Sequence, residues 1–501
     1  MKKIKILALL FLSLCLGSCE KYLDINQDPS NPQVAEGHVL LPALLQSMVR
    51  GEAYDSRYIG QYIQNWHASA AGNAWDRHGY VAGSDAAGEK WRQHYYALGQ
   101  NLMLQIKDGE EKGKWDYSGV AKAIQAWSWQ STTDYHGEMI LKEMFEPNRY
   151  VFDYDTQEAV YAEVVKVSNA ALTDLARTDG IVSTASLSRG DLVYKGDRTK
   201  WIKFVYGVLA RNAQHLSNKS SYNPDKVIEY VDKSLASNTD NFNIPHAGTS
   251  STDANFFGPT RNNMGSFRQS AYIVALMDGT IFKAKDPRLA LTLSPSVDGT
   301  YRGVNTTFGD PNASNINTRI PTLWNTVPGV TALTGKYIFQ DKVDFPILTY
   351  SELQFIKAEA LFIKGDKAKA LEAYKNGITA HMNYVGVATK DQTDYLASAA
   401  VVNVANNLKI SDIMTQKYIA LWGIGSLESW VDMRRYNYSS DVFLGFTLPV
   451  TTQLSADNNG KPAQRVRPRY NSEYVWNRNS LDLIGGNNND YHTYELWFTK
   501  K

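Results

Sequence analysis

The sequence predicts a mostly α protein with a scaffold of helix-turn-helix pairs and a loop-rich lobe packed over it. Three observations predict this fold. Apolar residues recur at helical spacing along most of the chain, and one helix pair has a tetratricopeptide-like pattern. Residues 239–345 are instead rich in Gly, Asn, Thr and Pro. A segment of that length is too long for a passive linker, so we expect loops laid over the helical body.

The N-terminal segment, residues 1–18, has the pattern of a lipoprotein signal peptide. A basic start is followed by an apolar run, Ile6 to Leu16, which is too short to span a membrane permanently. The run ends in Gly17-Ser18-Cys19, a small-residue cleavage site that closes on a cysteine. We therefore expect lipidation of Cys19 and anchoring of the mature chain through acyl chains. The alternative is an ordinary secretory signal in which this cysteine is incidental.

The composition argues against some partners and favours others. The chain has 52 basic and 51 acidic residues, a formal charge of +1, which gives no long-range field for nucleic acid. It has 30 Tyr and 12 Trp, many of them beside Asn, Gly, Asp or Ser. Aromatic side chains in polar surroundings suit hydrated binding faces.

Taken in order, residues 19–38 read as a tether, because Asp24, Asn26, Asp28, Pro29 and Pro32 disfavour regular structure. Residues 39–238 read as an N-terminal helical scaffold. Its expected helices cover residues 39–64, 91–106, 120–135, 156–177, 200–216 and 225–234.

The loop-rich lobe, residues 239–345, contains one expected helix, 266–283. Residues 346–436 are expected to form the tetratricopeptide-like helices, with segments at 349–365, 367–383 and 412–421. Residues 437–501 read as an irregular C-terminal segment whose last aromatic residues, Trp497 and Phe498, dock on the body.

The most regular helix pair runs from Leu353 to Ile378. Ala358 and Ala370 are small enough for two helices to approach closely, and Gly365 makes the turn between them. Met382 stands where this repeat usually has proline, so the match is partial. Because one such unit cannot bury its own apolar face, several related helix pairs should pack together.

Several short motifs, in their order and spacing, resemble the SusD/RagB family of outer-membrane lipoproteins. They are Ser18-Cys19-Glu20-Lys21-Tyr22-Leu23-Asp24-Ile25-Asn26 with Asp28-Pro29, Thr133 to Glu138, Tyr154 to Glu158, Asp191 to Tyr194 with Gly196-Asp197 and Lys200-Trp201, Asp286-Pro287-Arg288, Leu348 to Glu352 running into Ala358-Glu359-Ala360, and Trp430 to Tyr436. The resemblance covers nearly all of the chain.

This resemblance implies a SusD-like α/α fold and a position at the outer membrane, facing the cell surface. Family members cap a SusC-like TonB-dependent barrel, open and close like a lid, and hand oligosaccharide to the transporter without catalysis of their own.

Motifs for enzymatic chemistry are not evident in the sequence. Nine histidines are scattered, and none has the spacing that places two zinc ligands on one helical face. A glycosidase needs two carboxylates brought together in space, which a sequence cannot reveal. We therefore predict no catalytic residues, no metal and no cofactor, although Asx clusters such as Asp310 with Asn312 leave a structural Ca²⁺ open.

Two segments suit sugar binding, which needs a flat aromatic face flanked by amide or guanidinium groups. The candidates in an expected loop are Trp66, Asn73, Trp75, Arg77 and Tyr80. A second pair of candidates, Trp324 and Asn325, lies in the loop-rich lobe. The alternative is that these tryptophans are buried between the lobe and the helices and pack the two together.

The leading hypothesis is a lipid-anchored glycan-binding protein that serves a surface importer. Its rivals are a peptide-binding subunit of the same architecture and a structural tetratricopeptide adaptor. A concave aromatic patch would favour glycan, a long groove with paired charges would favour peptide, and no pocket would favour the adaptor.

Overall fold

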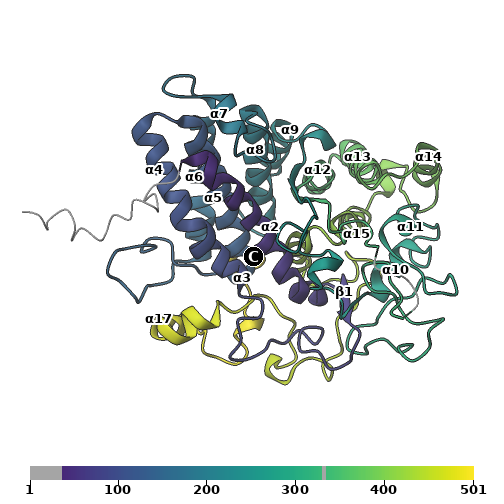
Figure 1. Ribbon diagram of the computed structural model, residues 1–501. Helices are drawn as coiled ribbons and strands as arrows, with labels where there is room; N and C mark the ends of the chain where they lie inside the picture. The colour runs from purple at the N-terminus through teal and green to yellow at the C-terminus, as the bar shows by residue number, and fades with distance from the viewer. Residues whose placement is uncertain (1–35, 330–333) are drawn as a thin grey trace, which may run out of the picture.

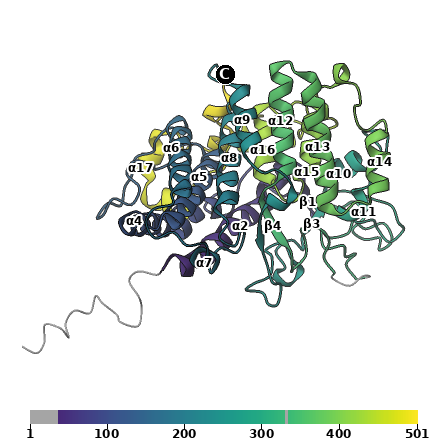
Figure 2. The same cartoon turned by 90° about the horizontal axis from the view of Figure 1, so that it is seen from above.

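The computed structural model describes residues 36–329 and 334–501, and most of the elements in them are helices. Figures 1 and 2 show the helices side by side in a broad array, with the loops gathered along one side. The expected signal peptide, Cys19 and most of the tether lie outside the described residues. Across the described part of the chain, no helix is both long enough and apolar enough to span a membrane.

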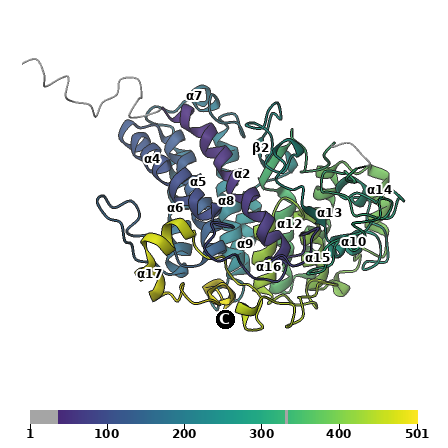
Figure 3. The ribbon, with the colours of Figure 1, turned by 60° about the horizontal axis from the view of Figure 1, so that its bottom comes forward.

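The N-terminal half forms the first part of the array around the long helix α2 (Gly37–Tyr62). The other elements are α3 (Glu89–Arg92), the π-helix η1 (Gln93–Gly99), α4 (Gln100–Lys112), α5 (Trp115–His136), α6 (Gln157–Ala176), α7 (Thr184–Ser188), α8 (Arg198–His215) and α9 (Pro224–Lys233). All of these helices except the short α7 overlap the segments that the apolar periodicity predicts. Helix α2 packs on α3 and η1, and in Figure 3 it passes in front of α5 and α8.

Side-chain caps explain why several of these helices begin where they do. The Thr156 hydroxyl accepts from the N–H of Ala159 at the start of α6, and the Asp197 carboxylate accepts from Thr199 and Lys200 at the start of α8. Each cap satisfies backbone donors that the first turn leaves unpaired.

The tetratricopeptide-like pair is present as α12 (Tyr350–Lys364) and α13 (Lys367–Val385). Ala358 and Ala370 are fully buried. Gly365 ends α12 with φ of +93°, a conformation that glycine adopts without strain. Small residues therefore bring these helices together as the sequence predicts. Helix α12 also packs on α9 and on α15 (Ile410–Leu421).

The lobe contains short strands that the sequence analysis missed. Strand β1 (Trp66–Ala68) pairs with β3 (Phe267–Gln269), and β2 (Phe242–Pro245) pairs with β4 (Asp344–Leu348), both antiparallel. Strands of three to five residues are too short to show the alternation by which strands are recognised.

The helix expected at residues 266–283 is shorter than predicted. It is α10 (Ala271–Met277), because Phe267–Gln269 join a strand and the Ser270 hydroxyl caps the helix by accepting from Ile273. Gly279, at φ of +98°, lies just past its end. Helix α11 (Leu289–Thr292) follows.

The remaining helices are α14 (Thr389–Ala397), α16 (Ser426–Arg435) and α17 (Arg478–Leu483), with a second π-helix, η6 (Tyr470–Tyr474), in the irregular C-terminal segment. At the chain end, Phe498 is fully buried and its ring stacks on Tyr161 of α6, with 6.2 Å between centroids. The segment after residue 436 thus folds back over the N-terminal helices (Figure 1).

Charged side chains in the core are paired across the scaffold. Arg211 of α8 binds Glu352 of α12 at 2.6 Å, and Arg435 of α16 binds Glu359 at 2.7 Å, with all four residues buried. Buried charges are tolerated only when such partners compensate for lost hydration. The first pair joins the N-terminal helices to the tetratricopeptide-like pair, and the second joins α16 to it.

Candidate functional site

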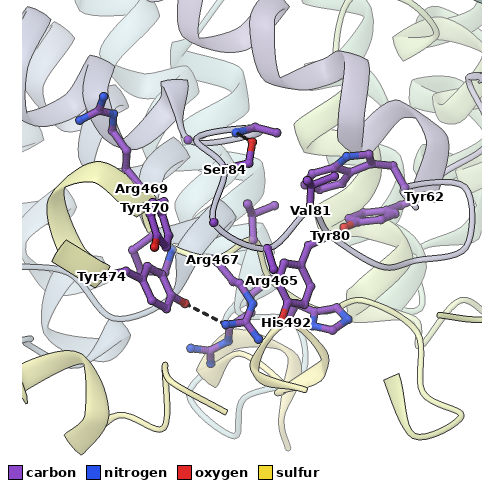
Figure 4. A pocket seen from close by; sticks show the side chains of 17 residues that line it. Tyr62, Tyr80, Val81, Ser84, Arg465, Arg467, Arg469, Tyr470, Tyr474 and His492 are labelled. Carbon is purple, nitrogen blue, oxygen red and sulfur yellow. Dashed lines mark hydrogen bonds between the residues drawn. The ribbon is translucent and has the colours of Figure 1, made fainter. Parts of the chain in front are cut away.

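An open hollow lies where the loop before α3 meets the C-terminal segment (Figure 4). We call it the Tyr80 hollow; it contains about 740 Å³ of space, including the part open to solvent. It is lined by Tyr62, Trp75, Tyr80, Val81, Ala82, Gly83, Ser84, Ala86, Gly88, Arg465, Val466, Arg467, Pro468, Arg469, Tyr470, Tyr474 and His492. Two segments far apart in the sequence therefore build one surface.

Aromatic rings provide flat faces in this hollow. The rings of Tyr470 and Tyr474 are stacked, with centroids 5.7 Å apart and planes 16° apart. They come from the π-helix η6, a rare conformation that is frequent at functional sites. Tyr80 lies between the guanidinium of Arg467, 3.9 Å from its ring centroid, and the imidazole of His492, at 4.9 Å.

Two tyrosine hydroxyls in the hollow are free to bind a ligand. In the described structure the hydroxyls of Tyr80 and Tyr470 form no hydrogen bond with the protein, whereas that of Tyr62 donates to Gly79 O at 2.6 Å. Partial burial raises the pKa of Tyr80, so this hydroxyl keeps its proton at neutral pH. Both groups can therefore donate and accept hydrogen bonds.

His492 is a neutral part of the lining. Burial lowers its pKa to about 4, and the nearby positive charge of Arg467 acts in the same direction. Its Nε2 lies 2.9 Å from Asn458 Oδ1, which fixes the ring. The fixed charges of the lining are therefore those of the three arginines, Arg465, Arg467 and Arg469.

Two of the residues predicted as ligand contacts line this hollow, and two lie beside it. Tyr80 is half-exposed and lines it, and Trp75 lines its inner side while packing on Tyr58 at 4.8 Å. Asn73 accepts from the backbone N–H of Trp75 at 2.8 Å, and Arg77 donates to Gln453 O at 2.8 Å. Asn73 and Arg77 thus shape the loop that carries Tyr80.

The other predicted contacts lie in the seam between lobe and helices. Trp66 is fully buried against Phe257 and Phe339, and Trp324 is buried with its indole N–H donating to Phe257 O at 2.6 Å. Asn325 forms the adjoining turn, at φ of +61°. Neither indole presents an open face in this conformation. Sugar contacts by these residues stay a prediction that requires the seam to open.

A second hollow adjoins the first and shares Arg469 with it. We call it the Tyr96 hollow; it contains about 1220 Å³ of space and is lined by Trp91, Arg92, Tyr95, Tyr96, Gln100, Ile140, Met144, Phe145, Glu146, Arg149, Phe152, Arg469, Ser472 and Glu473. Its wall is the π-helix η1, and Tyr96 is 72% exposed. Unlike the first hollow, it has paired charges, such as Arg149 with Glu146 at 3.0 Å.

Asp134, His215 and Glu428 form a buried cluster with the residue types of a metal site. Their ligand atoms lie within 4.8 Å of one another. Burial alone lowers the pKa of His215, but the facing carboxylates of Asp134 and Glu428 more than offset this and raise it to about 9. The cluster is therefore an ion-paired link between α5, α8 and α16.

Sequence reasoning missed the C-terminal half of the Tyr80 hollow. One signal was available: residues 465–470 read Arg-Val-Arg-Pro-Arg-Tyr, three cations within six residues of a nearly neutral chain. Proline and alternating arginines give neither helical nor strand periodicity, so the pattern predicts only irregular structure here.

Comparisons with known proteins give a consistent result. A family model named SusD-like and described as "Starch-binding associating with outer membrane" matches residues 29–467. No curated protein matches the sequence.

Solved structures of 19–20% sequence identity share the fold. A SusD/RagB family protein from Bacteroides thetaiotaomicron is 20% identical, with a TM-score of 0.72 over 93% of this chain and 99% of that one. A SusD homolog from Bacteroides uniformis is also 20% identical, with a TM-score of 0.70 and the same coverage. A chitin-binding SusD homolog from Flavobacterium johnsoniae is 19% identical, with a TM-score of 0.65 over 92% of this chain and 96% of that one.

Proposed function

The chain belongs to the SusD-like family, and from this we propose that it is a non-catalytic glycan-binding protein that delivers oligosaccharide to a SusC-like TonB-dependent transporter. The family description places such proteins at the outer membrane and associates them with starch, and one of the similar structures is named as chitin-binding. The expected lipidation of Cys19 would hold the protein on the outer membrane, facing the cell surface.

The observation that carries the proposal is the Tyr80 hollow. Sugar rings have an apolar face that packs on aromatic rings and hydroxyls that need hydrogen-bond partners. The stacked Tyr470 and Tyr474 supply the aromatic rings, and the free hydroxyls of Tyr80 and Tyr470 supply hydrogen-bond partners. The hollow is open to solvent, as capture of a polymer segment requires.

Peptide binding is the second candidate, and the Tyr96 hollow favours it. That hollow combines exposed aromatic surface with ion pairs, the feature expected of a peptide site. A purely structural adaptor is disfavoured, because two adjoining hollows of this kind have no role in it.

The test is binding of residues 20–501 to soluble starch, chitooligosaccharides, polygalacturonate and mixed peptides, measured by isothermal titration calorimetry. Tyr80→Ala and Tyr470→Ala should each weaken glycan binding by about tenfold, the equivalent of one lost contact of about 1.4 kcal/mol, a hydrogen bond for Tyr80 and a stacking contact for Tyr470. Tyr150→Ala is the matched control, because Tyr150 is 82% exposed and lines neither hollow. Peptide binding alone, or glycan binding that both variants retain, would overturn the proposal.

The anchor is tested separately in the full-length chain. Cys19→Ser should move the protein from the membrane fraction to the soluble fraction, because the acyl chains supply the expected membrane affinity. Cys15→Ser is the matched control, since Cys15 lies in the segment expected to be removed. Retention of the Cys19→Ser variant in the membrane would refute lipid anchoring at this residue.

A further inference from the structure

We propose that the glycan unit bound in the Tyr80 hollow is acidic and carries a carboxylate, as in a uronic acid, or a sulfate ester. The inference rests on the proposed function, because it specifies the ligand of the same site. It goes beyond the names of the similar proteins, since starch and chitin are neutral.

The lining of the hollow is unbalanced in its polar groups. Among the described residues that form it, none is Asp, Glu, Asn or Gln. The polar side chains are instead three arginines, His492, Ser84 and tyrosines. A neutral sugar offers hydroxyls that both donate and accept, so its site should contain side-chain acceptors as well as donors. Arginine only donates, and it suits a ligand that only accepts, such as a carboxylate or sulfate.

Arg467 is the central cation of the lining, and no carboxylate neutralises it within the described residues. Its guanidinium donates to Tyr474 Oη at 3.1 Å and to the backbone carbonyls of Gly486, Asn488 and Asn489. Its Nε is buried and has no hydrogen-bond acceptor among the described residues. Carbonyl oxygens hold the group in place but do not cancel its charge.

The two neighbouring arginines differ from Arg467 in this respect. Arg465 forms an ion pair with Glu138, and Arg469 forms one with Asp85 at 2.7 Å. Both carboxylates lie outside the lining. The charge that remains uncompensated inside the hollow is therefore that of Arg467.

Stacking fixes the orientation of this guanidinium. Its carbon lies 3.9 Å from the centroid of the Tyr80 ring, so the cation covers one face of that ring and lies next to any ligand that contacts the Tyr80 hydroxyl. Guanidinium is less strongly hydrated than ammonium. Because its outer N–H groups are bonded to Tyr474 and to backbone carbonyls, Arg467 acts on a ligand through its charge. A uronic acid on Tyr80 would thus bring its carboxylate close to Arg467.

Three further carboxylates act on the site from outside. Asp457 affects the pKa of Tyr80, Asp490 that of His492 and Glu473 that of Tyr474, but none of them lines the hollow. They reduce the positive potential at the rim without offering an acceptor inside. Replacing Asp490 by Asn should therefore strengthen the binding of an acidic ligand.

Matched ligand pairs test the proposal on residues 20–501. We would compare oligogalacturonate with its fully methyl-esterified form, and dextran sulfate with dextran, by isothermal titration calorimetry. One acidic probe should bind about tenfold more tightly than its neutral partner, as an electrostatic attraction of about 1.4 kcal/mol implies. This preference should weaken with added NaCl, which screens charges. The pair that shows the preference identifies carboxylate or sulfate.

Two variants of Arg467 separate its charge from its structural contacts. Arg467→Lys keeps the charge and should keep most of the preference, whereas Arg467→Gln should abolish it. Arg319→Gln is the control, because Arg319 likewise donates to backbone carbonyls, of Ala313 and Pro328, and does not line the hollow. Thermal unfolding of each variant shows whether the fold is retained. A lost preference in an intact Arg467→Lys variant, or a preference kept in an intact Arg467→Gln variant, would refute the role of this charge.

The failure of this inference differs from the failure of the proposed function. If glycans bind and Tyr80→Ala abolishes that binding, but the acidic and neutral partners bind equally, the site is a glycan site and the inference is wrong. If no glycan binds, or if Tyr80→Ala has no effect on binding, the proposed function itself fails and this inference fails with it.

Discussion

Replacing His215 by glutamine should remove a pH-dependent contribution to stability. His215 is buried, with Nδ1 3.1 Å from Asp134 Oδ2 and Nε2 3.0 Å from Glu428 Oε2. Its folded pKa of about 9 lies above the unfolded value of 6.5, so the folded state holds the proton more tightly. The stabilisation is therefore fully present below pH 6.5 and is lost as the pH rises through 9. The difference between these pKa values corresponds to about 3 kcal/mol, at roughly 1.36 kcal/mol for each pH unit.

The assay is urea unfolding of the wild type and of His215→Gln at pH 7 and pH 9.5. Other groups also titrate, so the measured quantity is the difference in unfolding free energy between the two proteins at each pH. About 2 kcal/mol of this difference should disappear between the two pH values. His67→Gln is the control: burial lowers the pKa of His67 to about 3, so its linkage acts only as the pH falls below 6.5. If the unfolding free energies of the wild type and His215→Gln differ by the same amount at both pH values, the prediction that His215 is protonated in the folded state is refuted.

Three further substitutions test the packing and the buried charges. Gly60→Ala should destabilise the fold by about 1–3 kcal/mol in thermal unfolding, because the added methyl group would lie 2.5 Å from the Trp66 indole; an unchanged midpoint would contradict this close packing. Arg435→Met should cost about 3–5 kcal/mol in urea unfolding, because it leaves Glu359 buried without its partner, and a loss below 1 kcal/mol would argue against the pair. Burial raises the pKa of Asp55 to about 8, so the wild type should lose stability as the pH rises through 8. Asp55→Asn keeps His215 but lacks this carboxyl, so it should lose less stability than the wild type between pH 6 and pH 9, and equal losses in the two proteins would disprove the shift.

Helices were predictable from the sequence because their signal is local. Apolar residues on one face, a capping side chain and a turn glycine all lie within a few residues of one another, as they do around Gly365 between α12 and α13. The helix expected at residues 266–283 was too long because strand β3 is defined by its partner β1, some two hundred residues earlier in the chain. Pairing between distant segments leaves little mark on either sequence alone.

The candidate site was harder to predict, because its halves come from opposite ends of the chain. Asn458 reaches His78 O across 380 residues, and this contact fastens the Tyr80 loop to the C-terminal segment. A tryptophan in a polar sequence can be an exposed ring that stacks on a sugar or a buried ring that packs between the lobe and the helices, and the local sequence fits both. For Trp66 the choice depends on the close approach of Gly60 and on Phe257 and Phe339, which no local pattern reveals. Clustered charge carries more information. The fold leaves Arg467 without a carboxylate partner among the described residues, and the proposed acidic ligand would supply one.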